Sequence, residues 1–384
     1  MKIQLLNKIA DIGLQELDNS YTIGEDVQDP DGILVRSAVM HDMEFGSSLK
    51  AIARAGAGVN NIPIDRCSEN GIVVFNTPGA NANGVKELAV CALLLAARDV
   101  VGGVEWVKSI AGTPDVAKQV EKGKSMFAGT ELTGKTLGVV GLGAIGGLIA
   151  NVAYRLGMKV IGCDPFLSVE GAWNLNHHVT RAATFDEIFE KADYITLHVP
   201  ATKDTKNMIN AESIAKMKDG AKLINLARAD LVNAADLTAA LTSGKISAYV
   251  TDFPTEEILN APHVVAIPHL GASTEESENN CAVMAAREID DYLKNGNIRN
   301  SVNFPSVDLP RSGAARICAL HANIPAVITG ITAALAAEGL NIENMTSKSK
   351  GDNACTVIDV SSAPSPAAVD RIRAISGMLR VRVV

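Results

Sequence analysis

Three residues suited to anion binding and proton transfer follow three aliphatic runs in the central part of the chain. Arg228 comes directly after KLINLA, Glu256 comes soon after AYVTDF, and His269 follows VVAIP. The planar donors of a guanidinium match a carboxylate, and an imidazole exchanges protons near neutral pH. A carboxylate beside that imidazole would favour its charged form and fix its tautomer. The three side chains predict a site that holds an anionic substrate and moves a proton.

A glycine-rich turn precedes these residues in the chain. GLGAIG (141–146) is a GxGxxG sequence that follows an aliphatic run and opens an amphipathic helical pattern. Such glycines permit a tight turn, the close approach of a pyrophosphate to backbone N–H groups, and close helix packing. Asp164 ends the next run, where a carboxylate accepts hydrogen bonds from ribose hydroxyls and disfavours a 2′-phosphate, so we predict NAD rather than NADP. The expected contacts are Gly141, Gly143, Ala144, Ile145, Gly146 and Asp164.

The elements that position these residues form an alternating pattern. Helical patterns separate six aliphatic runs, which occupy residues 136–141, 159–164, 194–199, 222–227, 248–253 and 264–268. Continuously aliphatic runs are typical of strands buried on both faces of a parallel sheet. The alternation predicts a doubly wound α/β (Rossmann) domain. Because the carboxyl ends of parallel strands line one edge, we expect the chemistry-bearing residues to meet there.

The flanking regions predict two further domains. Residues 1–95 show a looser α/β alternation, and they combine with 275–300 into a smaller flavodoxin-like substrate-binding lobe, into which the NAD-binding domain (96–274) is inserted. A Pro- and Gly-containing linker (301–313) follows. The order β-α-β-β-α-β over residues 314–384 is typical of a ferredoxin-like unit.

Composition excludes several function classes. The 384 residues carry 35 Lys+Arg against 43 Asp+Glu, and this balance argues against nucleic-acid binding. No apolar run approaches the roughly 20 residues of a bilayer span, and the N-terminus lacks the pattern of a signal peptide. The six cysteines are scattered, which favours free thiols in a reducing cytoplasm over a metal site or disulfides.

Several segments resemble one enzyme family. INLARADLVN, DFPTEE and IPHLGAST resemble the catalytic motifs of the D-isomer-specific 2-hydroxyacid dehydrogenases, and GVVGLGAIGG with Asp164 resembles their NAD motif. The resemblance runs through essentially the whole chain. It implies that Arg228 holds the substrate carboxylate and carbonyl, that His269 is the acid/base, and that Glu256 supports His269. Further cofactor contacts implied by the family are Val199, Ala227, Asp252 and Gly271, with the nicotinamide-amide role open between Asp252 and Thr251.

The resemblance also suggests the substrate. Arg36 and Ser37 fall where family members that act on 3-phosphoglycerate hold its phosphate, and this chemistry suits a guanidinium with a neighbouring hydroxyl. RAGAGVNNI resembles the loop whose backbone binds the substrate carboxylate, here at Gly58 and Val59, and Asn81 matches a position facing substrate and nicotinamide. Oxidation of another D-2-hydroxy acid (glyoxylate/hydroxypyruvate or 2-hydroxyglutarate type) and a non-catalytic NAD(H)-sensing role remain alternatives.

The C-terminal unit resembles an ACT domain, a module that binds amino-acid effectors. Its segments HANIP and GLNIEN carry the resemblance. The likeness implies serine as an effector, bound through His321, Asn323 and Asn341. It also implies a homo-oligomer, a dimer or a tetramer.

Overall fold

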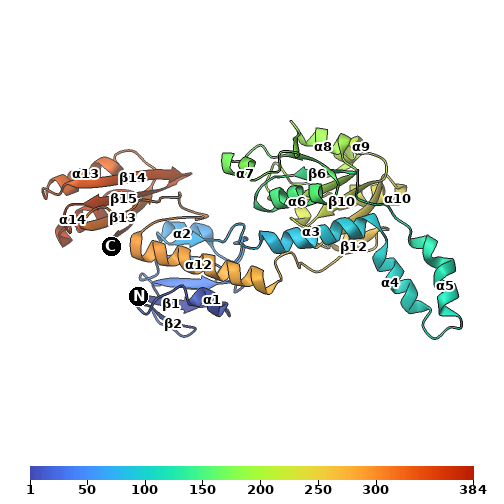
Figure 1. Ribbon diagram of the computed structural model, residues 1–384. Helices are drawn as coiled ribbons and strands as arrows, with labels where there is room; N and C mark the ends of the chain where they lie inside the picture. The colour runs from blue at the N-terminus through green and yellow to red at the C-terminus, as the bar shows by residue number, and fades with distance from the viewer. The chain divides into compact units, whose positions relative to one another are not determined.

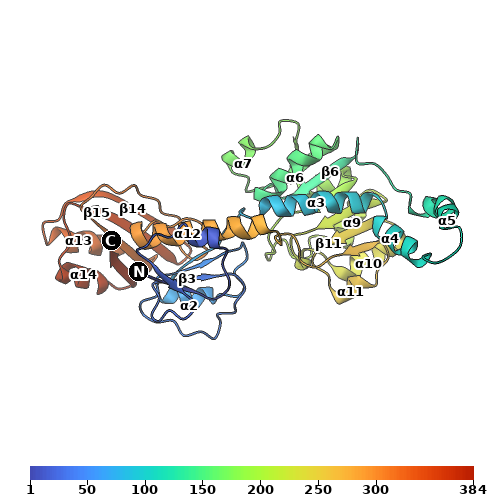
Figure 2. The same ribbon diagram turned by 60° about the horizontal axis from the view of Figure 1, so that its bottom comes forward.

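The computed structural model describes all 384 residues, which divide into two compact units. Unit 1 comprises Met1–Asn81 with Glu275–Val384, and unit 2 comprises Ala82–Thr274. Each unit contains a parallel sheet with helices, and unit 1 also holds a separate antiparallel sheet (Figures 1 and 2). The predicted fold class is therefore confirmed. None of the helices combines the length and apolar character needed to cross a lipid bilayer.

Unit 2 is built on a seven-stranded parallel sheet in the order β12-β11-β10-β9-β6-β7-β8. Its strands are β6 (Thr136–Val140), β7 (Lys159–Cys163), β8 (Thr180–Arg181), β9 (Tyr194–Leu197), β10 (Ala221–Asn225), β11 (Ile246–Thr251) and β12 (Val264–Ala266). Sequence order reverses between β6 and β9, which is the switch point where doubly wound folds bind ligands.

Unit 2 contains eleven helical elements, and several of them cover the two faces of its sheet. They are α3 (Ala82–Ala97), α4 (Val100–Ser109), α5 (Val116–Gly123), η1 (Lys124–Phe127), α6 (Ala144–Arg155), α7 (Val169–Trp173), α8 (Phe185–Lys191), α9 (Ala211–Lys216), η2 (Ala229–Leu231), α10 (Ala234–Ser243) and α11 (Glu256–Leu259). Consecutive residues of β10 pack into the hydrophobic cores on the two faces of the sheet. Leu223 belongs to one core and Ile224 to the other. The continuous aliphatic runs arise because both faces are buried.

Side-chain caps fix two helix starts of unit 2. The side chains of Thr184 and Asn233 accept hydrogen bonds from the N–H groups of Glu187 and Asp236, at the starts of α8 and α10. α3 packs its apolar face onto the sheet of unit 2, so the expected domain boundary at 95/96 falls inside a helix of this unit. α4 and α5 bury none of their residues and extend away from that sheet (Figure 1).

The N-terminal part of unit 1 is a five-stranded parallel sheet in the flavodoxin-like order β2-β1-β3-β4-β5. Its strands are β1 (Lys2–Leu5), β2 (Thr22–Gly24), β3 (Gly32–Val35), β4 (Ala51–Arg54) and β5 (Val73–Phe75), and its helices are α1 (Asp11–Leu14), α2 (Ile64–Glu69) and α12 (Glu275–Asn295). α12 packs on this sheet: its residues Ile289 and Tyr292 share a core with Ile3, Leu34 and Phe75.

The C-terminal part of unit 1 has the predicted β-α-β-β-α-β order. Its elements are β13 (Ala315–Ala322), α13 (Val327–Ala336), β14 (Ile342–Lys350), β15 (Asn353–Val360), α14 (Pro366–Arg373) and β16 (Met378–Val383). The antiparallel sheet has the order β14-β15-β13-β16. One face packs on α13 and α14 through Ile317 and Ala319. The other face, with Cys318 and Leu320, joins the core around α12.

Two features fasten this sheet to the rest of unit 1. Residues 301–313, expected as a linker, are packed, and their Phe304 and Val307 are fully buried in the core around α12. In addition, Arg316 of β13 forms a bidentate, fully buried ion pair with Asp359 of β15, with N–O distances of 2.6 and 2.8 Å. Arg316 Nη1 also donates to the carbonyl of Asn295 at the end of α12.

Loss of the Asp359 charge is expected to destabilise unit 1. Asp359→Asn leaves a buried guanidinium without its counter-charge, which costs about 3–5 kcal/mol. Asp370→Asn, which breaks an exposed pair with Arg373, is the matched control and should cost at most about 1 kcal/mol. Calorimetric unfolding of both variants measures the difference. Equal unfolding temperatures of the two variants would contradict the assigned role of the buried pair.

The same pair predicts a pH dependence. Burial raises the pKa of Asp359, but hydrogen bonds from Arg316 and Ser312 outweigh burial and lower it from 3.8 to about 2. Because the folded-state pKa is depressed, the stabilisation is present above the unfolded value and is lost as pH falls toward the folded one. The stability difference between the parent and Asp359→Asn should therefore shrink over this range.

Candidate active site

One row of paired residues crosses the sheet of unit 2 near its carboxyl edge. The register aligns Cys163, Val140, Leu197, Asn225, Thr251 and Ala266 on six neighbouring strands. Within three positions beyond this row the chain places Asp164, Gly141, Val199, Arg228, Asp252 and His269. Parallel pairing therefore brings the predicted cofactor and catalytic residues of unit 2 to a single edge, and Glu256 comes five positions after Thr251.

The glycine turn at this edge is close-packed on its inner side and open on its outer side. Gly141 has φ +90°, and a Cβ there would lie 2.7 Å from the carbonyl oxygen of His198. A Cβ on Gly146 would lie 1.9 Å from the carbonyl oxygen of Gly141, whereas a Cβ on Gly143 would meet nothing within 4 Å. Gly143 is the N-cap of α6, where free N–H groups and the helix dipole favour an anion. The open space at Gly143 fits a dinucleotide pyrophosphate.

Asp164 holds the turn in place. Its carboxylate accepts hydrogen bonds from the backbone N–H of Leu142 (2.9 Å) and of Phe166 (2.8 Å). Each carboxylate oxygen has a second lone pair, so Asp164 can also accept hydrogen bonds from ribose hydroxyls. Beside the turn, His198 is partly buried and its Nε2 lies 2.8 Å from Thr196 Oγ1; desolvation lowers its pKa to about 3, so it is a neutral structural residue.

Thr251 and Asp252 differ in what they leave available to a ligand. Thr251 is buried, donates to the carbonyl of Asn225 (2.9 Å), and accepts from the N–H of Phe253 (3.0 Å). Asp252 is 1% exposed; its Oδ2 accepts from Gly271 N–H (3.2 Å), and its buried Oδ1 has no partner. Burial raises the pKa of Asp252, against the opposing effects of Gly271 N–H, His269 and Arg228. An unpartnered buried acceptor fits the amide donor of a nicotinamide.

An aromatic ring joins Arg228 to His269. The Arg228 guanidinium carbon lies 5.7 Å from the centroid of the Phe253 ring, and that ring lies 4.4 Å from the His269 ring, tilted by 47°. Buried Asn225 fixes the strand end, since its side chain donates to the Arg228 carbonyl and accepts from the N–H groups of Ala227 and Arg228. Arg228 uses Nη1 on the Ala227 carbonyl (2.6 Å) and keeps its other guanidinium donors for a ligand.

Sequence reasoning missed both Asn225 and Phe253. Asn225 ends a strand that was recognised only by its apolar residues. Phe253 lies inside the motif DFPTEE, whose carboxylates carry the more evident chemistry. An aromatic residue two positions past a buried strand end was the available signal.

Glu256 does not meet His269 in this structure. It is the first residue of the four-residue helix α11, it is exposed, and its carboxylate makes no hydrogen bond or ion pair. The first turn of a helix favours a carboxylate on its own, because the free N–H groups there are partly positive. The structure therefore brings Arg228 and His269 to the same ring and leaves Glu256 outside that contact.

The predicted substrate residues lie in unit 1. Arg36 Nη2 forms an exposed ion pair with Glu278 (2.5 Å). Asn7 Oδ1, which sequence reasoning missed, accepts from three consecutive N–H groups, those of Arg36, Ser37 and Ala38. These bonds fix the end of β3.

The remaining substrate candidates have unused hydrogen-bonding groups. The backbone N–H groups of Gly58 and Val59 make no hydrogen bond within the chain. The side-chain oxygen of Asn81 is buried and has no partner. Donors and an acceptor in this state suit the binding of a small polar ligand.

The predicted effector residues all have partners within the C-terminal part. His321 is 3% exposed; its Nδ1 lies 2.8 Å from the Ala322 carbonyl and its Nε2 lies 2.9 Å from Thr356 Oγ1. Since a carbonyl only accepts, Nδ1 carries a proton and donates to Ala322. The side-chain amides of Asn323 and Asn341 donate to the Gly351 carbonyl and to Glu343.

Comparison with known proteins connects these features to one family. Residues 92–271 match the family model described as "D-isomer specific 2-hydroxyacid dehydrogenase, NAD binding domain". The chain is 31% identical over 370 residues to D-3-phosphoglycerate dehydrogenase of Escherichia coli K12, covering 92% of this chain and 86% of that protein. It is 37% identical over 317 residues to the Synechocystis enzyme of the same name, covering 79% of this chain. The chain spans about half the length of that relative, 54%.

A solved structure shows the same likeness. NAD⁺-bound 3-phosphoglycerate dehydrogenase of Entamoeba histolytica superposes with a TM-score of 0.62 at 29% identity, covering 79% of this chain and 98% of the other. The NAD-binding domain predicted from the glycine turn is thereby confirmed, and the turn and the free Asp252 oxygen suit that cofactor.

Two glycine substitutions in the turn should have opposite effects. Gly143→Ala places a methyl group in the open outer space, so NAD binding should weaken by about ten- to a hundredfold, while stability falls by less than about 1 kcal/mol. Gly146→Ala forces a Cβ against the Gly141 carbonyl, and overpacking of this kind costs about 1–3 kcal/mol. NADH fluorescence titration and thermal unfolding separate the two effects. Unchanged NADH affinity in Gly143→Ala would contradict the assigned pyrophosphate position.

Proposed function

The chain belongs to the D-isomer-specific 2-hydroxyacid dehydrogenase family, and from that premise we propose that it is an NAD-dependent D-3-phosphoglycerate dehydrogenase. Such an enzyme oxidises D-3-phosphoglycerate to 3-phosphohydroxypyruvate. The observation that carries the proposal is the convergence of Arg228, Phe253 and His269 beyond one strand row that also holds the NAD turn. Relatives of the same name at 31–37% identity support the choice of substrate.

The geometry suggests a division of labour in the reaction. The free donors of Arg228 hold the substrate carboxylate and polarise the oxygen on C2. His269 takes the hydroxyl proton during oxidation and returns it during reduction. NAD, when bound, supplies the acceptor for the hydride that leaves C2. Arg36 binds the phosphate in exchange for its present partner Glu278, and the free N–H groups of Gly58 and Val59 bind the carboxylate.

Glu256 and the nicotinamide-amide residue complete the proposal. Glu256 is exposed and unpaired, so its side chain is free to turn toward His269 when substrate binds. We assign the nicotinamide amide to Asp252 rather than Thr251, because Thr251 is already engaged and Asp252 Oδ1 is not. The other cofactor contacts are Val199, Ala227 and Gly271. Each follows a strand of the same row, at the edge where the cofactor binds.

We further propose the domain roles, the assembly and the regulation. Residues 1–81 with 275–300 bind substrate, 82–274 bind NAD, and 314–384 act as an ACT domain that binds serine through His321, Asn323 and Asn341. Binding through His321 requires its ring to leave Thr356 or Ala322. The exposed apolar residues of α4, among them Val100, Val104 and Val107, suit pairing with a second copy in a cytoplasmic dimer or tetramer.

The function is tested by NADH absorbance with the purified full chain. The panel contains 3-phosphoglycerate, D-lactate, D-2-hydroxyglutarate, glyoxylate and hydroxypyruvate, each with and without serine. We expect the highest kcat/KM for the phosphorylated pair of substrate and product. A preference for any unphosphorylated acid would refute the substrate assignment, and no turnover on the whole panel would favour an NAD(H)-sensing role.

Removal of the Arg36 charge should act on phosphate binding alone. Arg36→Ala is expected to raise KM for 3-phosphoglycerate by about ten- to a hundredfold, the loss of one charge-assisted interaction. KM for an unphosphorylated acid should change by no more than about twofold. Arg373→Ala, an exposed arginine of the same unit, is the matched control. An equal rise in KM for both types of substrate in Arg36→Ala would contradict this assignment.

Phe253 is expected to act as a positioning residue for Arg228 and His269. Phe253→Leu keeps the apolar volume but removes the ring, and a lost cation–π contact of about 0.5–1 kcal/mol corresponds to a two- to fivefold fall in kcat/KM. Phe253→Tyr keeps the ring and should retain parent activity. If both variants lose activity equally, the ring contact is not what matters.

A further inference from the structure

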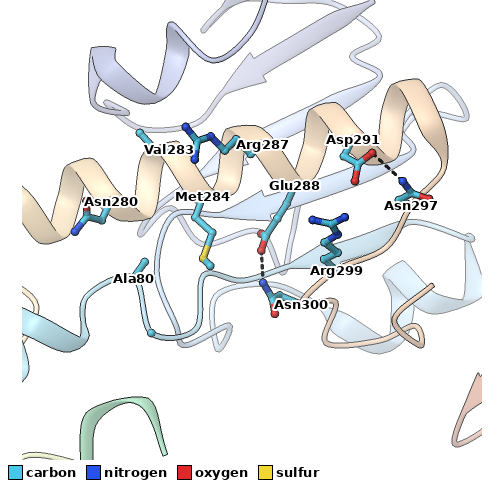
Figure 3. Close-up of a pocket in the computed structure, with 11 residues that line it drawn as sticks. Ala80, Asn280, Val283, Met284, Arg287, Glu288, Asp291, Asn297, Arg299 and Asn300 are labelled. Carbon is cyan, nitrogen blue, oxygen red and sulfur yellow. Dashed lines mark hydrogen bonds between the residues drawn. The ribbon is translucent and has the colours of Figure 1, made fainter. Parts of the chain in front are cut away.

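Unit 1 contains a pocket of about 590 Å³ whose lining includes none of the residues assigned above to the reaction (Figure 3). Its ceiling is one face of α12, from which Asn280, Met284 and Glu288 project at intervals of four residues. Its floor is formed by two segments, residues 79–80 and residues 297–300. The volume falls within the range of about 300–1,000 Å³ typical of small-molecule sites.

Glu288 is the unusual group in this pocket. The residue is 7% exposed, and its Oε1 accepts from Asn300 Nδ2 at 2.6 Å. Figure 3 draws this hydrogen bond as a dashed line. Its Oε2 is buried and has no hydrogen-bond partner. Burial raises the pKa of Glu288 to about 8, against the opposing effect of the Asn300 hydrogen bond. A buried acceptor left without a donor is costly, and a ligand that supplies one would recover that cost.

The other lining groups define what such a ligand must carry. Arg287 donates from Nε and Nη2 to Glu16, and Arg299 donates from Nη2 to Asp308. The Nη1 group of each arginine is therefore available to an anion. Arg299 projects toward α12 next to Glu288 (Figure 3). Ala80, Val283 and Met284 supply an apolar wall. The pocket therefore offers an acceptor for a cation, donors for an anion, and apolar surface between the two segments and the helix.

We propose that this pocket binds a free α-amino acid with an apolar side chain. Its ammonium group donates to Glu288 Oε2, its carboxylate accepts from Arg299, and its side chain packs on Val283 and Met284. Burial favours the neutral carboxyl in the empty pocket, and a bound ammonium favours the carboxylate again. The two then form a charge-assisted hydrogen bond, the stronger kind in a low-dielectric site. The site is separate from His321, Asn323 and Asn341, and it does not depend on the substrate proposed above.

Calorimetric titration of the full chain with L-leucine tests the proposal. We expect saturable binding of one leucine per chain. Isoamylamine, which lacks the carboxylate, and 4-methylpentanoate, which lacks the ammonium, should each bind about tenfold or more weakly than leucine. Absence of saturable leucine binding overturns the proposal, as does 4-methylpentanoate binding as tightly as leucine.

Two variants on the same helix locate the binding. Glu288→Gln keeps the shape and the acceptor for Asn300 but puts an amide NH₂ group, which cannot accept a hydrogen bond, in the place of Oε2, so leucine should bind about ten- to a hundredfold more weakly. Glu276→Gln, an exposed glutamate of α12 outside the pocket, should bind leucine like the parent. Thermal unfolding confirms that both variants are folded. If Glu288→Gln is folded and binds leucine with parent affinity, the pocket is not the site.

Discussion

Hydrogen bonding between parallel strands sets where chemistry can occur in unit 2. The register pairs Asn225 with Thr251 and Thr251 with Ala266, and Leu197 and Val140 continue the same row. A slip of one residue in any pair would turn alternate side chains to the opposite face and move a strand end by about 3.3 Å. Backbone pairing, rather than contacts among side chains, therefore brings the site residues to one edge of the sheet. These are the glycine turn, Arg228, Phe253 and His269.

Buried polar groups then refine the positions that the register allows. The Asn225 side chain accepts from the Ala227 N–H and donates to the Arg228 carbonyl. The Thr251 hydroxyl, on the neighbouring strand, donates to the Asn225 carbonyl. These bonds cost little because both partners are satisfied inside the protein. The free oxygens of Asp252 and Asn81 contrast with them, since both are buried without a partner. Buried polar groups with hydrogen-bond partners hold the framework in place. Buried polar groups without a partner mark where a ligand can bind.

Much of the fold could be predicted because burial on both faces leaves an unambiguous pattern. The six aliphatic runs of unit 2 all became strands, and GLGAIG stands at the predicted turn. β2 was missed because it is a short strand with no buried residue, and β1 because it buries only Ile3. α4 and α5 were missed because they bury no residue, so no apolar stripe faces a core.

The site was harder to predict than the fold because side-chain contacts depend on rotamers and distant neighbours. Arg228 and His269 were found from their place after strands, but their common neighbour Phe253 follows a different strand. The Glu256 pair with His269 was expected from residue type, position after a strand and the family resemblance, none of which carries information about side-chain direction. Glu288 sits in a helix whose sequence is polar on average, and its contact with Asn300, twelve residues further along the chain, is not visible in that sequence.

The interrupted layout of unit 1 has a consequence during synthesis. Its five-stranded sheet is made within the first 81 residues, yet the helix that covers that sheet, α12, emerges only after the whole of unit 2. At about 5–20 residues per second, Ile3, Leu34 and Phe75 remain uncovered on the nascent chain for roughly ten seconds or more. Unit 2, which is continuous, can meanwhile complete its own core. The early strands are therefore the part of this chain that most needs shielding from other nascent chains at the ribosome.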